Sequence, residues 1–157
     1  MLEIFRLFGL GLLGVGALTL WRMWQRPGAP VEIADSDFRP GQEWAYRTRP
    51  GEESSTLTVL RVERAPKLGV IVHVCVDGVR IGNPTSSAQP MRHLGHLPMS
   101  EDAVRRSVTR KLRDDAPLPG FEDGYEIWRD AYDQGEGGAF SIPVAEVVAA
   151  IAETLPQ

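Results

Sequence analysis

Near its start the chain has a long apolar stretch, residues 7–21, with no charged side chain and an arginine on each side. Flanking arginines can extend their charges to a membrane surface, so the apolar helix can be counted over 4–24, roughly 30 Å and enough to cross a bilayer core. A cleaved signal is disfavoured because no small-x-small cleavage site comes after it. A buried helix that is apolar all round would need neighbours on every side. We therefore expect 1–26 to be a transmembrane anchor helix.

Two kinds of residue indicate how this predicted anchor would sit in a membrane. Small residues allow close approach of a neighbouring helix, although glycine is also simply common in spanning helices: Gly9, Gly11, Gly14 and Gly16. Basic and aromatic residues favour the membrane interface: Arg6, Trp21, Arg22, Trp24 and Arg26. Basic residues slightly favour the carboxyl side of the helix, so we expect a single-pass protein of the bacterial inner (cytoplasmic) membrane with its globular domain in the cytoplasm.

Composition constrains the rest of the chain, residues 27–157. The segment 27–41 is rich in proline, glycine and acidic residues, which is typical of a linker, and 42–157 is long enough for one globular domain. The formal net charge of -4 gives the chain no electrostatic reason to bind nucleic acid. Cys75 is the single cysteine, which excludes an intrachain disulfide and a cysteine-based zinc cluster.

Three runs in this domain have the composition of β-strands: 43–48, 56–62 and 69–81. Pro50-Gly51 predicts a turn between the first two, and Asp77-Gly78 has the composition of a two-residue hairpin turn. If that hairpin forms, five apolar side chains share one core face: Val72, Val74, Val76, Val79 and Ile81. The pattern predicts an antiparallel meander of three to four strands.

After a loop expected at 83–98, the periodicity becomes helical. A helix capped by Ser100 is expected to continue to about residue 113, because apolar residues recur every four positions: Val104, Val108 and Leu112. A second helix over 122–134 places three aromatic residues on one face: Tyr125, Trp128 and Tyr132. A third, with start signals at Ser141 and Pro143, has an apolar stripe: Val144, Val147, Val148, Ile151 and Leu155. The predicted class is α+β, with three helices packed on the meander and the transmembrane helix before it.

Five segments together resemble a small uncharacterised bacterial domain family of unknown function: WAYRTRPGEESSTLTVLRVE, IVHVCVDGVRIGNP, HLPMSEDAVRRSV, FEDGYEIWRDAYDQGEGGAF and SIPVAEVV. The resemblance covers about 39–157. It implies a cytoplasmic fold to which the N-terminal helix has been added. It implies no activity, cofactor or site residue.

The three histidines are the main candidates for chemistry. His93 and His96 are three residues apart and, on a helix, could face one metal ion with His73 or a carboxylate as a third ligand. A nearby glycine and proline favour a loop, in which the two would be solvated or bonded to backbone. His73 lies in the strongest strand beside Cys75 and is interpreted as a half-buried, satisfied histidine. We expect no catalytic, metal-binding or cofactor-binding residue, and no cofactor.

One helix of the domain is expected to have a basic face, which is either simply solvated or in contact with anionic lipid or an acidic partner: Arg105, Arg106, Arg110 and Arg113. The sequence thus predicts a non-catalytic accessory subunit of a larger integral membrane protein complex, for example a respiratory or photosynthetic assembly, in contact with the lipid bilayer. The alternative is a membrane-tethered protein-binding module, such as an immunity-type inhibitor. An enzyme is the third hypothesis, which a deep pocket joining a histidine to a carboxylate would favour.

Overall fold

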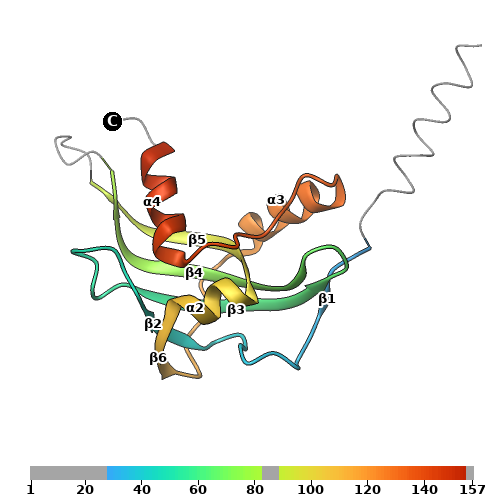
Figure 1. The fold of residues 1–157 in the computed structure, drawn as a ribbon, viewed down its shortest axis with the longest axis horizontal. Coiled ribbons are helices and arrows are strands. Elements are labelled where there is room, and N and C mark those ends of the chain that lie inside the picture. Colours follow the sequence, from blue (N-terminus) through green and yellow to red (C-terminus); the bar gives the residue numbers. More distant parts are fainter. Residues whose placement is uncertain (1–27, 83–88, 155–157) are drawn as a thin grey trace, which may run out of the picture.

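The computed structural model describes residues 28–82 and 89–154. They form an α+β fold in which three helices pack on a six-stranded antiparallel sheet of order β5-β4-β3-β2-β6, with β1 paired to β3 (Figure 1). The strands are β1 (Val31–Glu32), β2 (Glu43–Tyr46), β3 (Thr56–Ala65), β4 (Gly69–Ile81), β5 (Met91–Ser100) and β6 (Val108–Arg113). The helices, labelled as in Figure 1, are α2 (Glu101–Ser107), α3 (Glu122–Asp133) and α4 (Val144–Thr154).

The predicted fold class is wrong in two respects. The sheet has six strands, not three to four. Among the helices of residues 28–82 and 89–154, none has the length and apolar character that crossing a bilayer requires, so the structure contains no transmembrane helix in the part it describes. The segment predicted as an anchor, 1–26, lies outside the described residues. So do the residues assigned to helix packing and to the interface: Gly9, Gly11, Gly14, Gly16, Arg6, Trp21, Arg22, Trp24 and Arg26.

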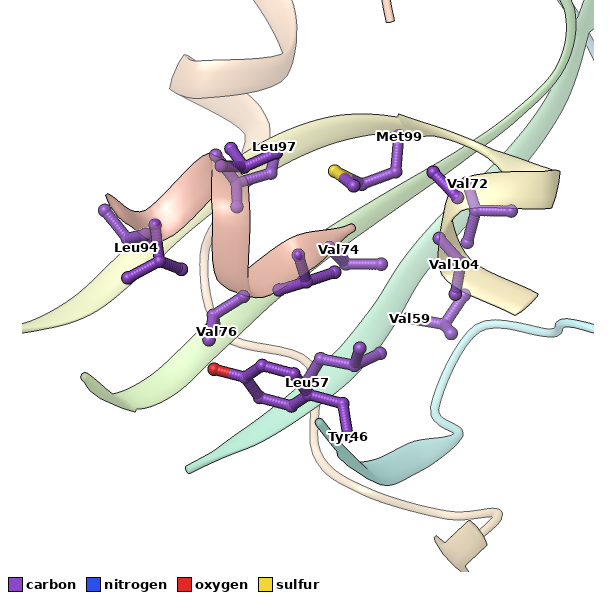
Figure 2. Close-up of a cluster of buried hydrophobic side chains, with 14 of the residues drawn as sticks. Tyr46, Leu57, Val59, Val72, Val74, Val76, Leu94, Leu97, Met99 and Val104 are labelled. Atoms are coloured by element: carbon purple, nitrogen blue, oxygen red, sulfur yellow. The ribbon is translucent and has the colours of Figure 1, made fainter. Parts of the chain in front are cut away.

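The main hydrophobic core lies between one face of the sheet and helices α2 and α4. Figure 2 shows Leu57 of β3 and Val74 of β4 pointing into the same cluster as Val104 of α2. All three side chains are fully buried, and burial of each contributes roughly 1.5–3 kcal/mol. The opposite face of the sheet has a smaller core against α3, formed by Ala65, Ile71, Trp128 and Tyr132. The sheet is therefore covered by helices on both faces, and the second face holds the candidate site.

Asp77-Gly78 is a bulge inside β4 and not the predicted hairpin turn. The strand continues through it to Ile81, and Gly78 has φ +81°. Ser55 fixes the bulge, because its hydroxyl donates to the Asp77 carbonyl over 2.6 Å. The β3–β4 hairpin turns earlier, where Leu68 N–H bonds to the Ala65 carbonyl. The bulge shifts the side-chain alternation of β4 between Val76 and Val79, which keeps five side chains in the one core: Val72, Val74, Val76, Val79 and Ile81.

Two edge strands lie where the sequence predicted other structure. Strand β5 occupies the second half of the expected loop at 83–98, and its Pro98 is tolerated because an edge strand leaves one side unpaired. The expected helix over 100–113 is half helix and half strand, since α2 ends at Ser107 and β6 then pairs with β2. The spacing of Val104, Val108 and Leu112 was misleading, because only Val104 lies in the helix. In both places the structure has an edge strand where the sequence predicted a loop or a helix.

Strand β1 was not predicted, because it lies in the segment 27–41 that was interpreted as a linker. The other elements agree with the sequence. Strand β2, strand β3 and the Pro50-Gly51 turn form as predicted, and Gly51 has φ +83°. Helix α3 buries Trp128 and Tyr132 against the sheet. Helix α4 buries the first part of its predicted stripe, Val144, Val147 and Val148. Leu155, the last residue of that stripe, lies outside the described part of the chain.

Candidate functional site

A chain of three ionisable side chains runs through the second face of the sheet. Glu63 of β3 accepts a hydrogen bond from His73 of β4, with Oε2 and Nε2 3.2 Å apart. The other nitrogen of His73, Nδ1, is 2.9 Å from Nε2 of His96 on β5. Glu63 and His73 are both 0 % exposed, so the first two members are sealed inside the domain. We call these residues the Glu63–His73–His96 chain.

Two bulges bring these side chains together. In β3, Val59 pairs with Val74 and Arg61 with His73, so Leu60 is an extra residue. In β5, the pairs Val74–Leu97 and Val76–Leu94 leave two residues, Gly95 and His96, opposite one residue of β4. A bulge re-aims the side chains of its strand. The candidate site therefore depends on irregular register on both sides of β4.

Further contacts hold the Glu63 carboxylate. Its Oε1 accepts hydrogen bonds from Arg61 Nε and from the Tyr125 hydroxyl of α3, each at 2.8 Å. The Arg61 guanidinium lies 4.7 Å from the centre of the Tyr125 ring. Trp128 packs edge-on against the His73 ring, with ring centres 4.7 Å apart. Both oxygens of the buried carboxylate are thus satisfied, which is what makes its burial tolerable.

The surroundings fix the protonation of the chain. Burial alone would raise the pKa of Glu63, but hydrogen bonds from His73, Tyr125 and Arg61 lower it to about 2. Burial, and then the neighbouring His73, lower the pKa of His96 to about 4. At neutral pH, Glu63 is therefore a carboxylate and His96 an uncharged imidazole. Because an ionised carboxylate only accepts, Nε2 of His73 carries a proton.

The direction of the second hydrogen bond follows from the first. Because Nε2 of His73 already donates to Glu63, an uncharged His73 can only accept at Nδ1, and His96 then donates through Nε2. This leaves Nδ1 of His96 with a free lone pair. The chain thereby fixes one tautomer of His96.

His96 forms part of the wall of a pocket of about 250 Å³ at the amino end of α3. Gly95 and His96 line it from β5, and residues 120–124 line it from the start of the helix. Gly124 packs tightly against the His96 side chain, since a Cβ at that position would lie 2.8 Å from Cβ of His96. We call this hollow the α3 pocket. It is where the buried chain reaches the surface.

The basic residues predicted as a partner or lipid surface do not form one helix face. Arg105 and Arg106 lie on α2, whereas Arg110 and Arg113 lie on β6. Three of the four are already in ion pairs: Arg105 with Asp37 at 3.1 Å, Arg106 with Asp102 at 2.9 Å and Arg113 with Glu43 at 2.7 Å. Exposed pairs of this kind are typical of a solvated surface.

The predicted histidine pair is separated. His93 bonds the exposed Asp77 over 2.6 Å, whereas His96 faces His73. Within residues 28–82 and 89–154, no group of three His, Cys, Asp or Glu side chains could hold a metal ion. Cys75 is fully buried, and burial followed by the charge of Asp77 raises its pKa to about 11. It is therefore a packed thiol and a poor nucleophile.

Sequence reasoning missed Glu63 and Tyr125 as partners of His73. A signal was available, because a β3–β4 turn at residues 66–68 brings 61–63 beside 71–73 in any antiparallel hairpin. The turn at 66–68 was missed because the hairpin turn was assigned to Asp77-Gly78 instead. His73 is also fully buried where half-burial was expected.

No family model matches the chain, and neither does any curated protein or solved structure. The resemblance to a bacterial domain family therefore stays a prediction. Function has to be argued from the α3 pocket and the side chains behind it.

Proposed function

We propose that the domain is a non-catalytic binding module that receives a ligand group in the α3 pocket beside His96. The observation that supports this proposal is the Glu63–His73–His96 chain, which ends at the pocket wall. Burying a carboxylate and an imidazole costs free energy that an apolar pair at the same positions would not. Perturbed ionisable groups that meet at a cleft are characteristic of functional sites.

Binding fits the chemistry of this pocket better than catalysis does. A general base is most effective when its pKa is near the working pH, and the pKa of His96 is lowered to about 4. Among the described residues that line the α3 pocket there is no hydroxyl, thiol or amine nucleophile. What the pocket offers is an imidazole that is uncharged at neutral pH and can hydrogen-bond a ligand.

This proposal develops the second hypothesis drawn from the sequence, a protein-binding module. The first hypothesis, an accessory subunit of an integral membrane complex in contact with the bilayer, stays a prediction because residues 1–26 lie outside the described part of the chain. A binding module with an occupied pocket is compatible with both hypotheses, the accessory subunit and the protein-binding module. The pocket is the part that can be tested directly.

A small-fragment screen of the full-length chain, followed by backbone amide NMR, tests the proposal. We expect fragments to shift residues 95–96 and 120–124 together. Gly120→Trp should abolish these shifts, because its Cβ has room and its ring would fill the hollow. Gly138→Trp is the matched control, since a Cβ there meets nothing within 4 Å and Gly138 does not line the pocket. Fragments that bind the Gly120→Trp variant as well as the wild type would refute the proposal.

A further inference from the structure

We infer that the α3 pocket takes a cationic nitrogen group, an ammonium or a guanidinium, of about the size of a lysine or arginine side chain. The inference rests on the proposed function and names the ligand class of the same pocket. It combines three features of the site: the charge of its rim, the acceptor at its wall and its volume.

The rim of the pocket is negative. Glu122 and Asp123 line it from the first turn of α3. The amino end of a helix favours anions, but its effect equals only about half a positive charge, against two full negative charges here. Part of that helical effect is already used, because the Glu122 carboxylate accepts a hydrogen bond from Phe121 N–H over 2.9 Å. The balance favours a cation.

The wall of the pocket presents an uncharged hydrogen-bond acceptor, which does not repel a positively charged ligand. His96 is uncharged at pH 7, so it does not repel a positive ligand. Its Nδ1 lone pair can accept an N–H donor, and the hydrogen bond to His73 holds the ring in place. Phe121 also lines the pocket, and an aromatic side chain is a favourable neighbour for a cation.

The volume limits the size of the ligand group. Pockets for drug-sized molecules measure roughly 300–1,000 Å³, and this one measures about 250 Å³. One ammonium or guanidinium on a short chain fills such a space. The group can come from a basic side chain of a partner protein or from a free small amine, and the two sources share this chemistry.

Titration of the full-length chain with three probes tests the inference. The probes are agmatine, the tripeptide acetyl-Ala-Arg-Ala-amide, and the same tripeptide with neutral citrulline in place of arginine. We expect the two cationic probes to shift the amides of 95–96 and 120–124, and the citrulline peptide to bind at least about tenfold more weakly, the loss of one charge-assisted contact. Tighter binding of the tripeptide than of agmatine would identify a protein side chain as the source, and the reverse a free amine.

Variants of the rim and the wall make the test specific. Glu122→Gln with Asp123→Asn should weaken agmatine binding about tenfold, whereas Glu126→Gln, an exposed acid on the same helix that does not line the pocket, should leave it unchanged. His96→Gln should also weaken it, because glutamine can still donate to His73 but presents no acceptor at the Nδ1 position.

Two results would overturn the inference and separate it from the proposed function. If citrulline peptide or inorganic phosphate shifts the pocket amides as strongly as agmatine, the ligand class is wrong but the binding module stands. If agmatine shifts the same residues equally in the Gly120→Trp variant, its binding lies elsewhere and both proposals fail for this pocket.

Discussion

Glu63 is the residue on which the candidate site depends. Its carboxylate is sealed in the second face of the sheet, yet it accepts hydrogen bonds from three side chains, those of Arg61, His73 and Tyr125. A charge in this position is stable only while its partners remain, because an unpaired buried carboxylate loses its hydration without compensation. Glu63 therefore stabilises the fold and also sets the tautomer of His73.

Glu63→Gln should lower the free energy of unfolding by about 3 kcal/mol, the usual consequence of breaking a buried ion pair. Glutamine keeps the size of the side chain but leaves Arg61 without its buried partner and offers Tyr125 a weaker acceptor. Urea unfolding at pH 7 measures the loss. The exposed Glu126→Gln is the control, and a loss at Glu63 no larger than that of the control would contradict this account of the network.

Acidification should destabilise the protein through His96. Its folded pKa of about 4 lies below the ordinary value of 6.5, so between these pH values the unfolded chain binds a proton that the native state does not. Stability from this source is complete above pH 6.5 and is lost as pH falls toward 4, by about 2 kcal/mol at pH 4.5. The corresponding loss at Glu63 begins only below its ordinary value of 4.5.

Unfolding curves at pH 7 and pH 4.5 for the wild type and for His96→Gln isolate this effect. The variant has no imidazole at position 96, so its stability should fall less over the same interval, by about 2 kcal/mol. Equal losses in the two proteins would show that His96 titrates normally in the folded state.

At the scale of elements, bulges determine which side chains meet. Gly78 allows the bulge of β4, because its φ of +81° is a conformation that other residues adopt at a cost. A Cβ at this position would also lie 3.1 Å from Cα of Ser55. The bulge then keeps Val79 and Ile81 in the main core.

Gly78→Ala should therefore destabilise the protein by about 1–2 kcal/mol. Gly138→Ala is the matched control, since a Cβ there meets nothing within 4 Å and the position has no positive φ. Thermal unfolding compares the two. A Gly78→Ala variant as stable as Gly138→Ala would mean that β4 does not bulge at this point.

The amino end of α4 is capped from a distant element. The buried Ser107, the last residue of α2, donates to the Ala103 carbonyl over 2.7 Å and accepts from Val144 N–H over 2.9 Å. One hydroxyl thus joins the end of α2 to the start of α4. The start signals found in the sequence were Ser141 and Pro143, and Ser107 was not found because a cap supplied from another part of the fold leaves no local signal.

Ser107→Ala should cost about 1–3 kcal/mol, since the buried Val144 N–H loses its partner. Ser141→Ala should cost less, because its side chain is exposed. Urea unfolding of the two variants distinguishes the caps. A larger loss for Ser141→Ala would restore the local cap that the sequence predicted.

An element could be predicted from the sequence where its own residues show a clear periodic pattern. Strand β3 and helices α3 and α4 have apolar periodicity and were predicted correctly. Strand β5 contains Gly95 and Pro98, which argue against a strand unless its place at the sheet edge is known. Residues 108–113 fit the four-residue spacing of a helix, and only pairing with β2 makes them a strand.

At the scale of the whole molecule, the sheet separates two environments. The face under α2 and α4 is a conventional apolar core, whereas the face under α3 contains the Glu63–His73–His96 chain. Strand alternation alone puts His73 on the face opposite Val72 and Val74. The position of His96 beside His73 could not be predicted in this way, because that contact needs the bulge of β5 and the pairing of β5 with β4. The candidate site is thus a property of the assembled sheet.

Long-range ¹H–¹⁵N NMR of the imidazole rings at pH 7, in the full-length chain, tests the central claim most directly. We predict that His96 is neutral, with its proton on Nε2 and a free lone pair on Nδ1, and that His73 carries its proton on Nε2 beside Glu63. A charged His96, or a proton on its Nδ1, would contradict the fixed tautomer and remove the acceptor from the α3 pocket.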